Sequence, residues 1–149
     1  MKDRNLPHSD NWATPPYVYD KLNEQYNFNF DPCPLKHDIT KWDGLEIEWK
    51  ERNFINPPYS KDLKPKFILK AVDEMKKGKL CVLLLPVSTS TKLFHDIILA
   101  NATEPVKFFK GRIKFIGHNT KGELVSNKSP MHDSMLVVFD GREKNDKKY

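Results

Sequence analysis

The chain has 149 residues, of which 38% are hydrophobic and 30% charged, and its formal net charge is +5. That length predicts one domain around one core, over residues 1–142, followed by a polar tail over 143–149 that is expected to fray. No apolar run approaches the roughly 18 residues of a membrane span, and the polar start is unlike a secretory signal, so we expect a cytoplasmic protein without membrane association. The two cysteines and five histidines lack metal-ligand spacing, which predicts no metal site.

The first two thirds of the chain alternate between helix and strand patterns. Thr14 followed by Pro15 is a hydroxyl N-cap with proline at the first helical position, which predicts a helix to about Tyr26. Short apolar runs predict strands over 28–30 and 52–55. The remaining expected elements are an amphipathic helix over 65–77, a buried strand over 80–85, a helix capped by Thr89 or Ser90 that continues to about Leu99, and strands over 106–109, 111–115 and 135–139.

This order of elements predicts an α/β protein. Strands that alternate with helices form mostly parallel sheets, while the last two expected strands are placed to pair antiparallel across the polar loop 117–133. We therefore expect a three-layer sandwich with a mostly parallel sheet and an antiparallel edge. Ligands of such sheets bind beyond the carboxyl ends of the strands, where Asp31, Asn56 and Pro86 fall.

The segment Asn56-Pro57-Pro58-Tyr59 follows one of these strands and has the chemistry of an amine-binding loop. An amine on a heteroaromatic ring is a poor nucleophile because its lone pair is delocalised, so a site that activates it must aim acceptors at both N–H bonds. Asn56 has a side-chain carbonyl and Pro57 a backbone carbonyl, and neither proline has an N–H that competes. Proline restricts the residue before it, which holds both acceptors in place, and Tyr59 offers a face for an extruded base.

The structural alternative for this segment is a rigid turn after a strand, with an aromatic side chain that packs. The chain contains such a case, because Thr14-Pro15-Pro16-Tyr17 ends in the same residue types without a preceding strand or a carbonyl side chain. We interpret that segment as a helix start and residues 56–59 as the catalytic loop.

Ile55-Asn56-Pro57-Pro58-Tyr59 resembles the Asp/Asn/Ser-Pro-Pro-Tyr/Phe motif of enzymes that methylate amino groups, and its surroundings resemble the phage-type DNA N6-adenine methyltransferase family over 11–139. The resemblance implies a Rossmann-like methyltransferase fold, S-adenosyl-L-methionine as the methyl donor and double-stranded DNA as the partner. It implies that an adenine is flipped out of the duplex onto Tyr59 and methylated on N6 in a bacterial or phage-infected cell.

The resemblance also implies a set of cofactor-binding residues. These are Trp12, Thr14 and Pro15 beside the methionine part of the cofactor, Asp31, Pro32 and Cys33 in the loop after the first strand, and Asp43 near the cofactor's adenine. Ordinary structural roles are the alternatives, since Thr14 is also an N-cap, Asp31 a loop cap and Asp43 a turn residue before glycine. The usual glycine-rich cofactor loop is missing, because prolines flank Cys33, and this leaves the acid that binds the ribose unassigned.

Charge is distributed unevenly, with an acidic stretch over 28–51 and lysine-rich stretches over 61–79 and 105–128. Lys110, Arg112 and Lys114 alternate along one expected strand, a pattern typical of phosphate contacts or of a solvated edge strand. We predict that these three residues bind DNA. Two other interpretations stay open, namely a methyltransferase that acts on RNA or on a protein amide, and a non-catalytic DNA-binding module on the same scaffold.

Overall fold

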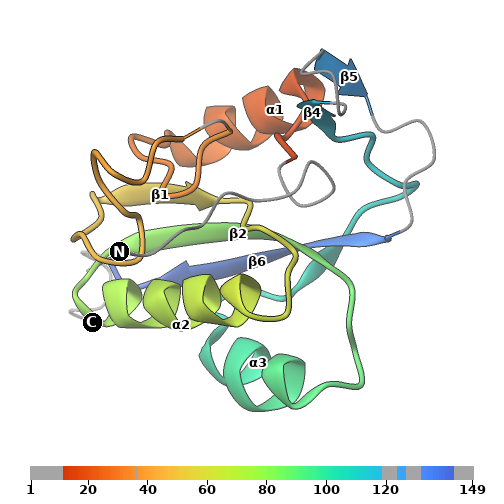
Figure 1. The fold of residues 1–149 in the computed structure, drawn as a ribbon. Helices are drawn as coiled ribbons and strands as arrows, with labels where there is room; N and C mark the ends of the chain where they lie inside the picture. Colours follow the sequence, from red (N-terminus) through yellow and green to blue (C-terminus); the bar gives the residue numbers. More distant parts are fainter. Residues whose placement is uncertain (1–11, 36, 119–123, 127–131, 143–149) are drawn as a thin grey trace.

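The computed structural model of the chain describes residues 12–35, 37–118, 124–126 and 132–142. Its centre is a four-stranded sheet in the order β1-β2-β6-β3, with helices on both faces (Figure 1). The elements are α1 (Pro16–Tyr26), β1 (Arg52–Ile55), α2 (Leu63–Lys76), β2 (Leu80–Pro86), a π-helix (Leu93–Ile98) that continues into α3 (Leu99–Asn101), β3 (Lys107–Phe108), β4 (Ile116–His118), β5 (Leu124–Ser126) and β6 (Ser134–Asp140). Strands β4 and β5 form a separate antiparallel pair.

The sheet is mixed, which confirms the α/β class but corrects the expected strand directions. β1 and β2 are parallel, whereas β6 is antiparallel to both of its neighbours, β2 and β3. Two of the three pairings of this described sheet are therefore antiparallel, and the antiparallel strand lies inside the sheet instead of at its edge. The reason is that β6 is buried along nearly its whole length, as a strand covered on both faces must be.

Two expected strands are shortened or absent. Residues 111–115 form no strand and do not pair with β6, because the chain turns through Gly111 at a φ of +77°, where it departs from the sheet. Ile113 and Phe115 are buried while Arg112 and Lys114 are exposed, so the segment has the alternation of a strand without its pairing. The strand expected over 28–30 is reduced to a single parallel bridge from Phe30 to Asn53.

Helix starts differ from the expected caps as well. Helix α1 has Pro15 at its N-cap position and no side-chain cap, so Thr14 does not cap it. In the helix after β2, Thr91 takes the place expected for Thr89 or Ser90, because its hydroxyl oxygen accepts the N–H of Phe94 at 3.1 Å.

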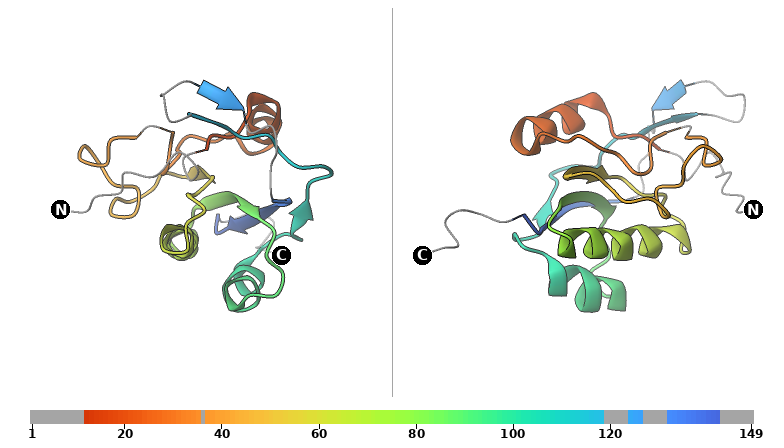
Figure 2. Two further views of the ribbon diagram at one scale, coloured as in Figure 1. Left: turned by 45° about the vertical axis from the view of Figure 1, so that its right-hand side comes forward. Right: turned by 90° about the vertical axis from the view of Figure 1, so that its left-hand side faces the viewer.

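Helices cover the two faces of the sheet with separate apolar clusters. Helix α1 covers one face, and α2 with the π-helix covers the other (Figure 2). Val18, Leu22 and Tyr26 of α1 belong to the cluster on the first face. The largest fully buried side chains of the second cluster include Phe67 and Phe139. The segment after β1, at the carboxyl end of that strand, lies beside the start of α1 and forms part of the site described below.

A buried ion cluster fixes the opposite end of the strands. The Glu74 side chain is fully buried and lies 2.6 Å from Lys79 Nζ, which also binds Glu48. Its carboxylate also accepts the N–H of Trp49 at 3.0 Å. Burial alone raises the pKa of Glu74, but the hydrogen bonds from Lys79, Trp49 and Lys70 outweigh it and lower the pKa to about 2.

Within the described residues, no helix is long and apolar enough to cross a membrane.

Candidate active site

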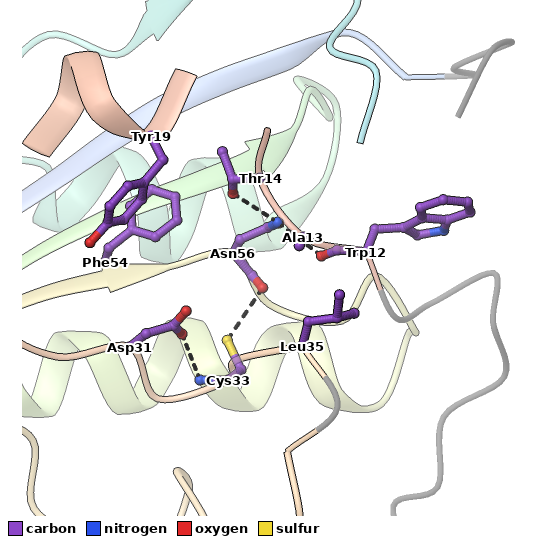
Figure 3. Close-up of a pocket in the computed structure, with 9 residues that line it drawn as sticks. All are labelled: Trp12, Ala13, Thr14, Tyr19, Asp31, Cys33, Leu35, Phe54 and Asn56. Carbon is purple, nitrogen blue, oxygen red and sulfur yellow. Dashed lines mark hydrogen bonds between the residues drawn. The ribbon is translucent and has the colours of Figure 1, made fainter. Parts of the chain in front are cut away.

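A pocket of about 120 Å³ opens at the carboxyl end of β1 (Figure 3). Phe54 and Asn56 are two residues apart along an extended chain, so both point to the same side of the sheet and into the pocket. Three segments contribute its lining, namely the approach to α1, helix α1 itself and the loop after Phe30. The lining residues are Trp12, Ala13, Thr14, Tyr19, Asp31, Cys33, Leu35, Phe54 and Asn56.

The fold brings five of the predicted site residues together in this pocket, namely Trp12, Thr14, Asp31, Cys33 and Asn56. The other six predicted catalytic and cofactor-binding residues do not line it. Pro15, Pro32, Pro57 and Pro58 are buried, Tyr59 bonds the Asn56 side chain, and Asp43 caps its own turn by accepting the N–H of Leu45 at 2.9 Å.

The side-chain amide of Asn56 is held by two segments. Its Nδ2 donates to the backbone carbonyl of Trp12 at 3.2 Å and to the hydroxyl oxygen of Thr14 at 3.1 Å (Figure 3). The Trp12 carbonyl has no proton to give, so it accepts from nitrogen and identifies which end of the amide is NH₂. Both N–H groups of Asn56 are thereby used within the protein, and Oδ1 points away from them.

Tyr59 lies on the other side of this amide. Its hydroxyl donates to Asn56 Oδ1 at 3.3 Å, a long bond that uses one of the two lone pairs of that oxygen. Burial, followed by the nearby Cys33, raises the pKa of Tyr59, so the hydroxyl stays protonated. The ring is perpendicular to those of Phe115 and His132, at 6.0 and 5.8 Å between centroids. Tyr59 is thus a fixed aromatic group beside the asparagine.

Asp31 is the carboxylate of the pocket. Its Oδ1 accepts the backbone N–H of Cys33 at 2.9 Å, and within the part of the chain that the structure describes no cationic side chain pairs with it. Burial raises the pKa of Asp31 to about 6, because the single backbone hydrogen bond offsets only part of the cost of desolvating the charge. Such a carboxylate is suited to a cationic ligand.

Cys33 connects Asp31 to the asparagine loop. While its N–H bonds Asp31, its thiol donates to the backbone carbonyl of Asn56 at 3.3 Å (Figure 3). The loop after Phe30 and the segment after β1 are therefore joined at the pocket by one residue.

Two aromatic residues of the pocket, Tyr19 and Phe54, were not predicted as site residues. Their rings meet edge to face at 5.2 Å between centroids and form an apolar wall beside Asp31. Phe54 was open to prediction, because it precedes Asn56 by two residues in a strand. Tyr19 carries no such local signal, since only the docking of α1 brings it to the pocket.

Lys110, Arg112 and Lys114 are exposed and lie outside the pocket, in the irregular segment after β3. Arg112 Nε is 2.9 Å from Asp133 Oδ1, and both side chains are more than half exposed.

Within the described residues, no group of three or more His, Cys, Asp or Glu side chains is placed to hold a metal ion.

Comparison with known proteins assigns the chain to a family. The profile of the DNA N-6-adenine-methyltransferase (Dam) family matches residues 3–147. The DNA N-6-adenine-methyltransferase of Haemophilus phage HP1 (strain HP1c1) is 36% identical over 142 residues, which cover 88% of this chain and 79% of the phage protein. No solved structure matches the chain. The chain therefore belongs to the DNA N-6-adenine-methyltransferase family.

Proposed function

We propose that this pocket binds S-adenosyl-L-methionine and that Asn56 positions the target adenine of double-stranded DNA beside it. Membership of the family makes the chain a DNA N6-adenine methyltransferase. The observation that carries the site assignment is the Asn56 amide, whose NH₂ is bonded to Trp12 and Thr14 and whose oxygen keeps one lone pair, beside the Tyr59 bond, for an amine.

We infer a Rossmann-like methyltransferase fold as part of the same proposal. Strands β1, β2 and β3 run in one direction, since β3 and β2 are both antiparallel to β6. Helices lie on both faces of this sheet (Figure 1). The pocket lies at the carboxyl ends of the parallel strands, where ligands of such sheets bind.

The chemistry of the pocket fits the cofactor. When bound, S-adenosyl-L-methionine supplies an electrophilic methyl group on a cationic sulfur. The Asp31 carboxylate has no cationic partner among the described residues and would offset such positive charge. Tyr19 and Phe54 present aromatic surface next to it and would exclude water from the reacting groups.

Asn56 and Pro57 act on the amine of the target base. The Asn56 side-chain oxygen and the Pro57 backbone carbonyl accept from its two N–H bonds, which localises the nitrogen lone pair toward the methyl group. Asn56 is neutral and is no base, so the amine proton passes to water after the nitrogen has become cationic. Positioning and electrostatics therefore supply the catalysis.

DNA contacts belong to two further groups of residues. Tyr59 offers a stacking face to the flipped adenine, and Pro58 keeps the loop beneath it rigid. Lys110, Arg112 and Lys114 contact phosphates on the outside of the pocket and contribute affinity without sequence preference.

The test of this proposal is Asn56→Ala, assayed by methyl transfer to a duplex that contains adenine. Turnover should fall by about a hundredfold or more, as it does when one preorganised transition-state partner is removed, while calorimetry shows little change in cofactor affinity. Asn101→Ala is the matched control, because among the described residues the Asn101 side chain bonds the Ile97 carbonyl, at 2.7 Å, in a helix away from the pocket.

A second pair of variants separates stacking from hydrogen bonding at Tyr59. Tyr59→Phe keeps the ring and should retain most activity, whereas Tyr59→Ala should raise the KM for DNA, since stacking is worth about 1 to 3 kcal/mol per base. A fully active Asn56→Ala would refute the proposed mechanism. Equal transfer to a duplex without adenine would refute the proposed base.

A further inference from the structure

The orientation of the Asn56 amide depends on its partners. Rotation of an asparagine side chain about its last torsion is soft, so the residue itself does not select one direction for Oδ1. The Trp12 carbonyl identifies the NH₂ end, but this bond and the long 3.3 Å bond from the Tyr59 hydroxyl to Oδ1 hold the amide plane only loosely. A second partner on the same nitrogen is needed to fix the plane, and that partner is the Thr14 hydroxyl at 3.1 Å.

Thr14 is itself held firmly in the right place. Pro15 follows it and restricts its backbone to an extended conformation. Ala13 before it exchanges backbone hydrogen bonds with Ile116 of β4 in both directions. Because α1 has no side-chain cap, the Thr14 hydroxyl is not engaged by the helix start, although the Thr-Pro pattern is typical of one. Among the described residues, the Thr14 hydroxyl accepts its hydrogen bond from Asn56 Nδ2.

We propose that Thr14 is a positioning residue for methyl transfer, which accepts from Asn56 Nδ2 and so aims Asn56 Oδ1 at the target amine. This inference rests on the proposed role of Asn56. It differs from a direct cofactor contact in its consequence, because a contact with the cofactor changes affinity, whereas a positioning residue changes the rate at saturation.

The test is Thr14→Val, which keeps the shape of the side chain and removes the acceptor. Single-turnover methyl transfer at saturating DNA and cofactor should slow about tenfold, the upper range expected for one neutral hydrogen bond. Calorimetry should find the S-adenosyl-L-methionine Kd changed by less than about twofold, because binding does not use the hydroxyl. Thr14→Ser restores the acceptor and should recover most of the rate.

Two further measurements separate positioning from general damage. Thr103→Val is the matched control, because the Thr103 hydroxyl bonds Val138 and Asp140 at the opposite end of the sheet; its loss should lower the unfolding temperature without changing the rate. In an Asn56→Ala background, Thr14→Val should cause no additional loss of rate, since the group that it orients is gone.

Three outcomes would overturn the inference. In the first, Thr14→Val has a normal rate at saturation. In the second, Thr14→Val weakens cofactor binding in proportion to its loss of activity. In the third, Thr14→Val slows the Asn56→Ala variant as much as it slows the parent. The first two leave the proposed function intact if Asn56→Ala itself is inactive. A fully active Asn56→Ala would instead remove the proposed catalytic role and this inference together.

Discussion

The charge of Asp31 costs stability, and we propose that it serves cofactor binding. Its pKa is raised by burial to about 6 in the folded chain, against 3.8 for an unperturbed aspartate. Between pH 4 and 6 the folded state therefore holds a proton that the unfolded state has lost, so the free energy of unfolding falls as pH rises through this window. Above pH 6 the penalty is complete and constant.

This linkage predicts opposite effects of Asp31→Asn on stability and on binding. The variant should unfold at a higher temperature than the parent at pH 7, with the difference shrinking toward pH 4, and it should bind S-adenosyl-L-methionine more weakly. In the parent, cofactor affinity should fall by up to about tenfold per pH unit below pH 6, as Asp31 takes up its proton. Calorimetry from pH 5 to 8 and thermal unfolding measure both quantities.

Asp73→Asn is the matched control, because Asp73 is exposed on α2 and away from the pocket. It should leave the pH profile of cofactor binding in place. A parent whose affinity is flat from pH 5 to 8 would show that the Asp31 charge does not contribute to binding.

At the scale of elements, the approach to α1 and strand β4 together hold one wall of the site. Ala13 bridges to Ile116, and the Trp12 ring lies so close over Gly117 that a Cβ there would come within 2.5 Å of ring carbon. Gly117 is needed for this close approach. Through it, a hairpin distant in sequence positions the Trp12 carbonyl that Asn56 uses.

Gly117→Ala should therefore push Trp12 out of place and lower both the unfolding temperature and turnover. Gly78→Ala is the control: Gly78 has a φ of +95° in the turn after α2, and its added Cβ would meet nothing closer than 3.9 Å. That variant should lose about 1 kcal/mol of stability from backbone strain, with turnover unchanged. Parent-like turnover in Gly117→Ala would mean that the Trp12 contact is not required by the site.

Across the whole molecule, the candidate site and the buried ion cluster lie at opposite ends of the sheet. Asp31 and Asn56 lie at the carboxyl ends of the parallel strands, while Glu74 and its lysines lie where β2 begins. Asp31 and Glu74 make the free energy of unfolding depend on pH in opposite directions. Because the pKa of Glu74 is lowered to about 2, its stabilising contribution is present above about pH 4.5 and is lost as pH falls.

The net charge of +5 gives the whole molecule an electrostatic attraction to the phosphates of DNA. If Arg112 contacts a phosphate, Arg112→Ala should reduce the slope of log K against log salt by about 0.9, with equal effect on all DNA sequences. The exposed ion pair with Asp133 is too weak to prevent this contact. Lys76→Ala, at the far end of α2, should leave the slope unchanged. An unchanged slope in Arg112→Ala would mean that this segment faces away from DNA.

The local sequence pattern was sufficient to predict those helices and strands whose own apolar residues indicate which side of the element is buried. The strand expected over 52–55 and the buried strand over 80–85 match β1 and β2 nearly to their bounds, and the amphipathic helix expected over 65–77 matches α2. The loop that we propose as catalytic could be picked out for the same reason, since residues 56–59 are contiguous and their chemistry depends on neighbours in the chain.

Only the tertiary structure decided the place of β6 and the partners of Asn56. An apolar run such as 135–139 suits any interior position of a sheet, so its sequence does not select between an edge partner and the space between β2 and β3. Thr14 has the local signal of a helix cap, yet its hydroxyl bonds a residue 42 positions away. Its role depends on the competition between a nearby helix start and a distant amide, and that competition is settled by packing α1 and β4 against the end of β1.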